Sequence, residues 1–370
     1  MGANRLPWMV MIFIALWAGA ACAQTDAPGG GAAQAPAATP AFTVPYYPPP
    51  TQMSLCGEPV PLRNEDAWER FDREFTIVVH SHAQVFLWLK RKERYFPSVE
   101  KWLRTKQLPD DLKYVAVAES DLLPVAQSPA GAVGPWQFIA STGKNYGLEQ
   151  APGIDERNDF EKSSESAFRY LADLHSMFPK WALAIAAYNC GENRVRDEVN
   201  RQKTDDYYNL KLPLETERYI FRILAIKAIL SNPETYGYRL PIGASYPEKP
   251  VDKVNVTLPA SLPIISASEA AGISYREFKQ LNPAFISDSI PEGSFMLVVP
   301  RGKGKDFQDR LAAAAFRSEA SQVLYTVKKG ETLSGVAAMY NVSLQDLRSW
   351  NGIRDADIVH PGQVLKILRR

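Results

Sequence analysis

The chain has 370 residues, and 42 Lys and Arg stand against 41 Asp and Glu, so the formal net charge is +1. This balance argues against a nucleic-acid-binding protein, which usually carries a clear basic excess. Three Cys are too few for a disulfide scaffold or an all-cysteine zinc site, and the four His do not supply the missing ligands. We therefore expect no metal and no cofactor, and the length suggests about two or three domains.

An export signal is predicted over residues 1–23. Arg5 is the only charge there, and the apolar run at 8–23 suits a signal-peptide core but is short of the ~20 residues that span a bilayer. Cleavage before Gln24, which we favour, and lipidation of Cys22 both stay open, and an uncleaved membrane anchor is a third interpretation. We expect the protein in the periplasm or cell envelope, with outer-membrane association if Cys22 is lipidated.

Residues 24–55 are expected to form a tether between this signal and the folded part of the chain. Residues 24–50 are rich in Pro and Ala, and Asp26 is their sole charge. Such a composition cannot bury enough apolar surface to offset the entropy of ordering, so it favours an extended or unstructured spacer.

Two cysteines, Cys56 and Cys190, remain after removal of the signal. An exported protein meets an oxidising environment, which permits a disulfide between them. Two free thiols are the alternative, because the sequence does not show whether the two residues lie close together.

A helical domain is predicted over residues 56–245. Apolar residues recur at steps of three or four from Trp68 to Leu89, which is the period of a helix. Pro97 is expected to end this helix and to begin another. Strand signals are nearly absent, and the remaining predicted helices cover residues 110–120, 165–178, 181–190 and 214–230.

Glu119 stands out because it closes an otherwise apolar helix segment, Val-Ala-Val-Ala-Glu-Ser. A carboxyl group there is either a solvated helix end, the ordinary interpretation of an isolated Glu, or a group held in a semi-apolar cleft. In a cleft, desolvation would raise its pKa toward the range that suits a general acid.

Three motifs follow Glu119 in order. The first is Ser-Pro-x-Gly-x-x-Gly-x-x-Gln, the second is Ala-Tyr-Asn at the end of an apolar helix, and the third is a Tyr on the last helix. Together with Glu119 they resemble the lysozyme-like lytic transglycosylases over about residues 105–235. The resemblance implies a mainly α, lysozyme-like catalytic domain that acts on the glycan strand of peptidoglycan.

The resemblance also implies a role for each matched residue. Glu119 would act first as acid and then as base on the β-1,4 bond between N-acetylmuramic acid and N-acetylglucosamine, leaving a 1,6-anhydro end without hydrolysis. Asp121 is the nearest candidate for a second carboxylate, and the sequence does not give its direction. The residues implied to bind substrate or to orient Glu119, each with a structural role as the alternative, are Ser128, Gln137, Tyr188, Asn189 and Tyr219.

The end of the chain, residues 323–370, reads as a strand, two helices and a strand. Its Lys-Lys-Gly-Glu-Thr-Leu entry, and the Pro-Gly-Gln before the last strand, resemble a LysM module, a βααβ unit that binds glycans containing N-acetylglucosamine. By position in that module, the implied glycan-binding residues are Gly330, Glu331, Thr332, Leu333 and Ile353.

A degenerate copy of this module is predicted over residues 250–302, joined to the last module by a linker or helix at 303–322. Asn282 and Gly293 of the copy pair with Asn351 and Gly362 of the last module. The copy lacks the Lys-Lys-Gly-Glu-Thr entry, so glycan binding and a spacer or packing role both stay open.

The expected protein is therefore an exported lytic transglycosylase with two small βααβ LysM-type modules after its catalytic domain. Its partners would be peptidoglycan glycan strands and not nucleic acid, and we expect a monomer. A hydrolytic muramidase on the same fold is the nearest alternative. A non-catalytic LysM scaffold that binds the cell wall is the alternative from another class.

Overall fold

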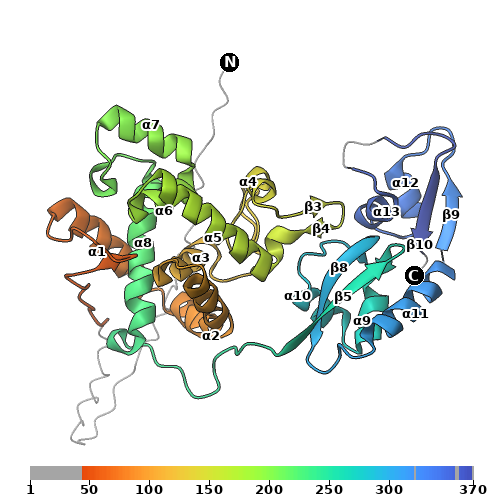
Figure 1. Ribbon diagram of the computed structural model, residues 1–370, viewed down its shortest axis with the longest axis horizontal. Coiled ribbons are helices and arrows are strands. Elements are labelled where there is room, and N and C mark those ends of the chain that lie inside the picture. Colours follow the sequence, from red (N-terminus) through yellow and green to blue (C-terminus); the bar gives the residue numbers. More distant parts are fainter. Residues whose placement is uncertain (1–43, 321, 355–357, 369–370) are drawn as a thin grey trace, which may run out of the picture. The chain divides into compact units, whose positions relative to one another are not determined.

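The structure, a computed structural model, describes residues 44–320, 322–354 and 358–368 (Figure 1). The predicted export signal, Cys22 and the part of the tether up to residue 43 lie outside the described residues. Within the described ranges, no helix is both long and apolar enough to cross a membrane.

The first folded part of the chain is mainly helical, as predicted, and its apolar side chains form one core. Two short hairpins accompany the helices: β1 (Ser54–Leu55) pairs with β2 (Glu58–Pro59), and β3 (Gln150–Ala151) pairs with β4 (Ile154–Asp155). The helices are α1 (Glu65–Val79), α2 (His82–Thr105), α3 (Lys113–Ser120), α4 (Ala140–Asn145), α5 (Phe160–Met177), α6 (Trp181–Cys190), α7 (Glu192–Gln202) and α8 (Leu214–Ser231).

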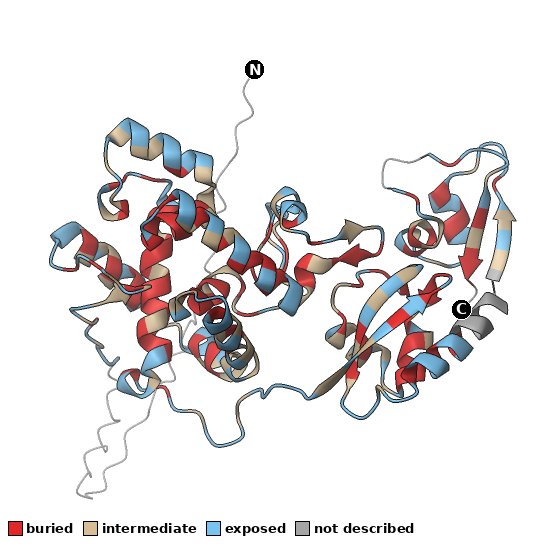
Figure 2. Ribbon diagram, viewed as in Figure 1, coloured by how far each residue is buried: buried red, intermediate tan, exposed pale blue. Residues whose placement is uncertain are grey.

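Helix α8 is the central element of this part, and Figure 2 shows it as largely buried. It packs against α1, α3 and α6. Its sequence is apolar on nearly every side after the first turn, which is the pattern of a helix surrounded by others rather than of a surface helix. The side chains of α8 are therefore fixed by packing on three sides.

The helix expected to run from Asn64 to Leu89 is two helices in the structure. Asn64 caps α1 by accepting a hydrogen bond from the Ala67 amide at 3.0 Å, and α1 ends at Val79, before a bend. The prediction that Pro97 ends a helix was wrong, because α2 continues through Pro97. The helix is held on both sides of the proline by a shared buried face, which includes Phe96, Val99 and Leu103.

Both C-terminal modules have the predicted βααβ order. In the first, β5 (Val251–Leu258) runs antiparallel to β8 (Gly293–Pro300). In the second, β9 (Gln322–Thr326) runs antiparallel to β10 (Val364–Leu368). The helices between these strands are α9 (Ile264–Ala271) and α10 (Tyr275–Leu281) in the first module, and α12 (Leu333–Met339) and α13 (Leu344–Asn351) in the second. The first module also contains a short pair, β6 (Leu262–Pro263) with β7 (Ser289–Ile290).

The paired asparagines of the two modules make the same contacts. Asn282 donates to the Val298 carbonyl and accepts from the Val298 amide, both at 2.8 Å. Asn351 donates to the Lys366 carbonyl at 2.9 Å and accepts from the Lys366 amide at 2.7 Å. In each module this side chain joins the second helix to the last strand, which is a physical reason for an Asn at both positions.

The segment expected to link the modules contains α11 (Phe307–Ala320), which packs against α9. Phe307, Leu311 and Ala314 are buried in the core of the first module. This helix therefore forms part of that module.

The disulfide that the sequence allowed is absent: Cys56 and Cys190 are free thiols. Burial, together with the negative charge of Asp111, raises the pKa of the Cys56 thiol. Burial also raises the pKa of Cys190, which lies beside Thr216. The two cysteines thus have different neighbours on different elements, and raised pKa values leave both thiols protonated and weakly reactive.

The central position of α8 predicts a sharp contrast between two substitutions on this helix. Ile223 is fully buried, and Ile223→Ala should lower the free energy of unfolding by about 2–5 kcal/mol through lost burial and a cavity. Leu214 is 68% exposed, so Leu214→Ala should change it by no more than about 0.5 kcal/mol. Urea unfolding measures both, and equal losses would contradict this account of the core.

Candidate active site

Glu119 lies in the last turn of α3, and Tyr219 of α8 reaches it. The Tyr219 hydroxyl donates a short hydrogen bond to Glu119 Oε1. Tyr219 is 2% exposed, whereas Glu119 keeps partial access to solvent. The carboxyl group is thus held by a buried side chain of a packed helix, on a residue that is itself partly exposed.

Burial raises the pKa of Glu119 to about 7, from an ordinary value of 4.5. The hydrogen bond from Tyr219 and the positive charge of Arg222 lower this pKa, and the negative charge of Glu215 raises it, but burial has the largest effect. A carboxyl group with this pKa is substantially protonated near neutral pH, so it can donate a proton and later take one back.

The Ala-Tyr-Asn motif joins three elements around Glu119. Burial and the charge of Glu119 raise the pKa of Tyr188 well above its ordinary value, so its hydroxyl stays protonated. That hydroxyl donates to the Trp136 carbonyl at 2.7 Å. Asn189 accepts a hydrogen bond from Thr216 Oγ1 at 2.7 Å, which ties α6 to the start of α8.

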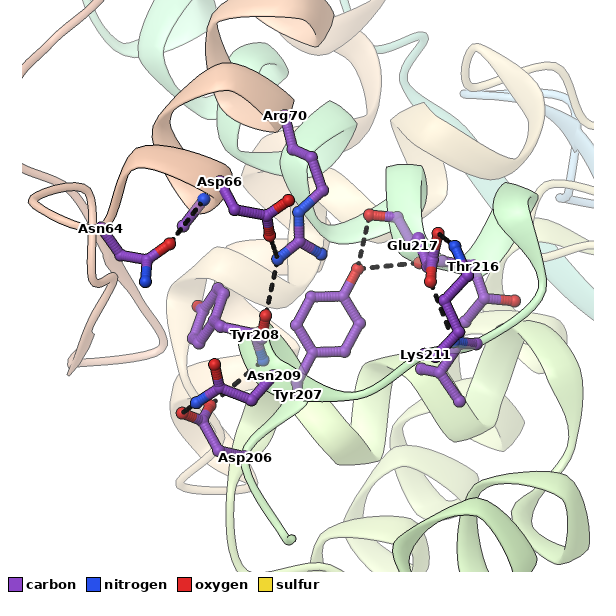
Figure 3. Close-up of polar contacts among 12 residues, drawn as sticks. Asn64, Asp66, Arg70, Asp206, Tyr207, Tyr208, Asn209, Lys211, Thr216 and Glu217 are labelled. Carbon is purple, nitrogen blue, oxygen red and sulfur yellow. Dashed lines mark hydrogen bonds and ion pairs between the residues drawn. The ribbon is translucent and has the colours of Figure 1, made fainter. Parts of the chain in front are cut away.

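The start of α8 is also held by the segment before it (Figure 3). The Tyr207 hydroxyl donates to the carbonyls of Thr216 and Glu217, at 2.8 and 2.9 Å. Arg70 of α1 donates to the Tyr208 carbonyl at 2.6 Å. Because these contacts fix the first turn of α8, they also fix Tyr219 one turn later.

Ser128 and Gln137 hold the loop between α3 and α4 in shape. Ser128 Oγ accepts from the Ala132 amide at 3.1 Å. Gln137 has a left-handed backbone (φ 49°) and donates to the carbonyls of Ala126 and Gly134, at 3.2 and 2.7 Å. Among the contacts of the described residues, neither side chain bonds Glu119.

Asp121 is turned toward α2. It ends α3 in the left-handed conformation (φ 56°), and its Oδ1 accepts from Trp88 Nε1 at 2.7 Å and from Gln84 Nε2 at 2.9 Å. Its carboxylate thus holds α2 against the end of α3, two residues along the chain from Glu119. The sequence left the direction of the Asp121 side chain open, and in the structure this side chain points to α2.

Sequence reasoning missed Arg157, which anchors the same loop. Arg157 is buried and donates to both carboxylate oxygens of Asp155, at 2.9 and 2.7 Å. It also donates to the carbonyls of Gly131 and Phe138, at 3.1 and 3.0 Å. In the sequence, an Asp-Glu-Arg run before a helix looks like a solvated turn. Only the tertiary contacts distinguish such a turn from a buried ion pair that anchors a loop.

Trp136, the residue before Gln137, is fully buried and donates to Ser164 Oγ at 2.8 Å. A residue in this position fixes the loop from inside and does not meet a sugar ring.

The residues assigned to glycan binding in the last module divide into two groups. Leu333 and Ile353 are buried in the module core. Thr332 caps α12 by accepting from the Gly335 amide at 3.2 Å, and Glu331 accepts from the Tyr325 hydroxyl at 2.7 Å. Gly330 has φ +86° and open space where a Cβ would lie. Gly330 and Thr332 are exposed, whereas the two apolar side chains are not available to a ligand.

The loop anchored by Arg157 predicts different costs for two glycine substitutions. A Cβ on Gly134 (φ +86°) would lie 1.8 Å from the Arg157 carbonyl oxygen, so Gly134→Ala must displace the loop. Gly131 has a similar φ (+81°) but no atom within 4 Å of its Cβ position, so Gly131→Ala should cost only about 1–2 kcal/mol of backbone strain. Urea unfolding should show the larger loss for Gly134→Ala, and equal losses would contradict the close approach.

Comparison with known families identifies three regions. Residues 98–211 match the model of the transglycosylase SLT domain, residues 251–315 match the LysM-like domain of lytic transglycosylase MltD, and residues 325–368 match the LysM domain. The SLT match covers Glu119 and the first two motifs that follow it. Tyr219, on α8, lies just beyond it.

Two curated relatives of this chain are named membrane-bound lytic murein transglycosylases. The chain is 32% identical over 293 residues to membrane-bound lytic murein transglycosylase D of Escherichia coli K12, which covers 75% of this chain and 64% of that protein. It is 31% identical over 147 residues to membrane-bound lytic murein transglycosylase F 2 of Alkalilimnicola ehrlichii, covering 35% and 31%. A solved structure, the soluble lytic transglycosylase SLT70 of E. coli, is similar over 49% of this chain and 31% of that chain, at 21% identity and a TM-score of 0.35.

The chain thus spans somewhat less than two thirds of the length of the transglycosylase D that it matches. The SLT match includes Glu119 and the anchored loop between α3 and α4. Tyr219, which bonds Glu119, follows it on α8. Three segments of the chain thus match, in order, the models of the transglycosylase SLT domain, the LysM-like domain of lytic transglycosylase MltD and the LysM domain.

Proposed function

We propose that this protein is a peptidoglycan lytic transglycosylase that cleaves the β-1,4 bond between N-acetylmuramic acid and N-acetylglucosamine. The observation that carries the proposal is a single carboxyl group, Glu119, whose pKa burial raises to about 7 and which a buried tyrosine holds in place. The SLT match and the murein transglycosylases among its relatives support the same substrate.

The reaction needs one group that is acid first and base afterwards. Protonated Glu119 donates its proton to the glycosidic oxygen as the bond to the anomeric carbon of the muramyl ring breaks. The acetamido group of the same sugar stabilises the positive charge that develops. Glu119, now a carboxylate, removes the proton from the 6-hydroxyl, whose oxygen bonds to the anomeric carbon and leaves the 1,6-anhydro ring. Glu119 ends the cycle protonated, and no water is consumed.

The direction of Asp121 favours this scheme over a hydrolase with two carboxylates. A two-carboxylate glycosidase needs a second acid across the scissile bond. Asp121 is engaged by Trp88 and Gln84 instead. A hydrolytic muramidase remains the alternative outcome of product analysis, because its product is heavier by one water molecule.

The two LysM-type modules would hold the enzyme on its substrate. A weak glycan contact at one end of the chain raises the effective concentration of substrate at the catalytic domain. We assign this contact to the loop that includes Gly330 and Glu331 in the last module, and the first module serves as a spacer or a second contact. A peptidoglycan substrate is consistent with a protein of the cell envelope, either cleaved before Gln24, the processing that we favour, or anchored by a lipid on Cys22.

Replacement of Glu119 tests the proposal. Glu119→Gln should lower the rate of release of anhydro-muropeptides from purified sacculi by at least about 10²–10⁴-fold, the usual contribution of a general acid–base group. Binding to sacculi should be unchanged, because the LysM-type modules are intact. Mass spectrometry of the products gives the reaction type in the same experiment.

Asp121→Asn is the matched control, since an amide oxygen can still accept from Trp88 and Gln84. It should keep cleavage within about tenfold of wild type. Full activity of Glu119→Gln would refute the assignment of Glu119. Reducing-end muramic acid in the wild-type digest would favour the muramidase, and wild-type binding without cleavage would favour the scaffold.

The hydrogen bond from Tyr219 predicts a pH effect with a definite sign. This bond lowers the pKa of Glu119, so Tyr219→Phe should raise that pKa, and Glu119 should keep its proton to higher pH. The basic limb of the pH profile of kcat/KM should then move to higher pH.

Tyr188→Phe is the control for this pH effect, because the Tyr188 hydroxyl bonds the Trp136 carbonyl and not Glu119. Its basic limb should stay where the wild-type limb lies. Two results would contradict the hydrogen bond from Tyr219 to Glu119. One is a basic limb that moves to lower pH in Tyr219→Phe, and the other is an equal shift of the basic limb in both variants.

A further inference from the structure

A buried carboxylate on α1 has no part in the mechanism above. Glu74 is 2% exposed and faces three guanidinium groups. It accepts a short hydrogen bond from its neighbour Arg73, and Arg218 Nε donates to it at 2.7 Å. Arg222 Nε lies 3.8 Å from its other oxygen. The Glu74 carboxyl group is thus buried among three guanidinium groups, whose positive charge offsets the cost of burying it.

Helix geometry places Arg222 about one turn along α8 from both Arg218 and Tyr219. Arg218 and Arg222 are four residues apart on α8, so both face Glu74 on α1. Tyr219 and Arg222 are three residues apart and also share a face, the one that Tyr219 presents to Glu119. By this spacing Arg222, like Glu215, shares a face of α8 with both Arg218 and Tyr219, and Arg222 is the cation of the two.

The charges around the two carboxyl groups come from a small set of elements. From α8, Tyr219, Glu215 and Arg222 act on Glu119, and Tyr188 of α6 lies near it. The positive charge of Arg222 lowers the pKa of Glu119, whereas Arg218 donates its hydrogen bond to Glu74. Around Glu74, the cations are Arg73 from α1 itself and the two arginines of α8.

We propose that Glu74 is a positioning residue for the reaction: it holds the Arg222 guanidinium and compensates its charge, so that Arg222 does not drive the proton off Glu119. The proposal rests on the function proposed above, since it concerns the proton that Glu119 delivers. Arg222 and Glu74 form an ion pair between α8 and α1, and Glu74 compensates the positive charge that Arg222 presents to Glu119.

Two substitutions should shift the titration of Glu119 in opposite directions. In Glu74→Gln the charge of Arg222 is uncompensated, so Glu119 should lose its proton at a pH lower by roughly half a unit or more. In Arg222→Gln the cation is gone, so the shift should be upward. The basic limb of kcat/KM for anhydro-muropeptide release should move with each.

Two further variants separate this effect from damage to the fold. Arg218→Gln removes another partner of Glu74 but leaves both Glu74 and Arg222 in place, so the basic limb of its pH profile should stay near the wild-type position. Adding Glu74→Gln to Arg222→Gln should cause no further shift, because Glu74 acts through Arg222. Arg222 is partly exposed, so Arg222→Gln should fold even if Glu74→Gln does not.

A carboxyl titration of Glu119 by ¹³C NMR, assigned by its absence in Glu119→Gln, gives the same shifts without substrate. Opposite shifts in both readouts support the proposal. Unmoved titration in folded Arg222→Gln, or shifts of one sign in both single variants, would overturn it. A wild-type enzyme that releases no anhydro product would refute the proposed function alone, because the NMR titration still decides the role of Glu74.

Discussion

The enclosed carboxyl group of Glu119 is the constraint on which the rest of the catalytic part depends. An acid that must also act as base needs a pKa near the working pH, and an exposed Glu does not have one. Placing Glu119 at the end of an apolar helix supplies the desolvation that raises its pKa, and the Tyr219 hydroxyl limits that rise while fixing the direction of the carboxyl group. Burial and hydrogen bonding thus act in opposite directions on one proton.

Helix α8 transmits this constraint to the remainder of the domain. Its first turn is held by the hydroxyl of Tyr207 and by Asn189 through Thr216, and its length is packed against α1, α3 and α6. A helix held at its start and along three sides cannot rotate freely, so the distance between Tyr219 and Glu119 is set by contacts far from both. The same rigidity explains why the loop between α3 and α4 is anchored separately, by Arg157.

Much of this arrangement could be predicted because it depends on local pattern. The apolar run before Glu119, the motif glycines and the repeat of Asn282 at Asn351 are visible in the sequence, and each has a local physical cause. The break between α1 and α2 before Ser81 was not predicted. The continuation of α2 through Pro97 was not predicted either, because buried contacts around Phe96 outweigh the loss of one backbone hydrogen bond. Arg157 and Glu74 were missed because a charged residue looks solvated until its partners from other elements are known.

The most direct test of the central claim measures the proton on Glu119 through stability. The folded chain keeps this proton up to about pH 7, whereas the unfolded chain loses it near 4.5, so the folded state binds more protons between these values. Stability of the wild type should therefore fall as pH rises through this window, by about 3 kcal/mol relative to Glu119→Gln, which does not titrate there. Urea unfolding of both proteins from pH 4 to pH 8 measures the difference. A difference that grows with pH and levels off above about pH 7 is the result predicted here, and a difference independent of pH would show that Glu119 is an ordinary solvated carboxylate.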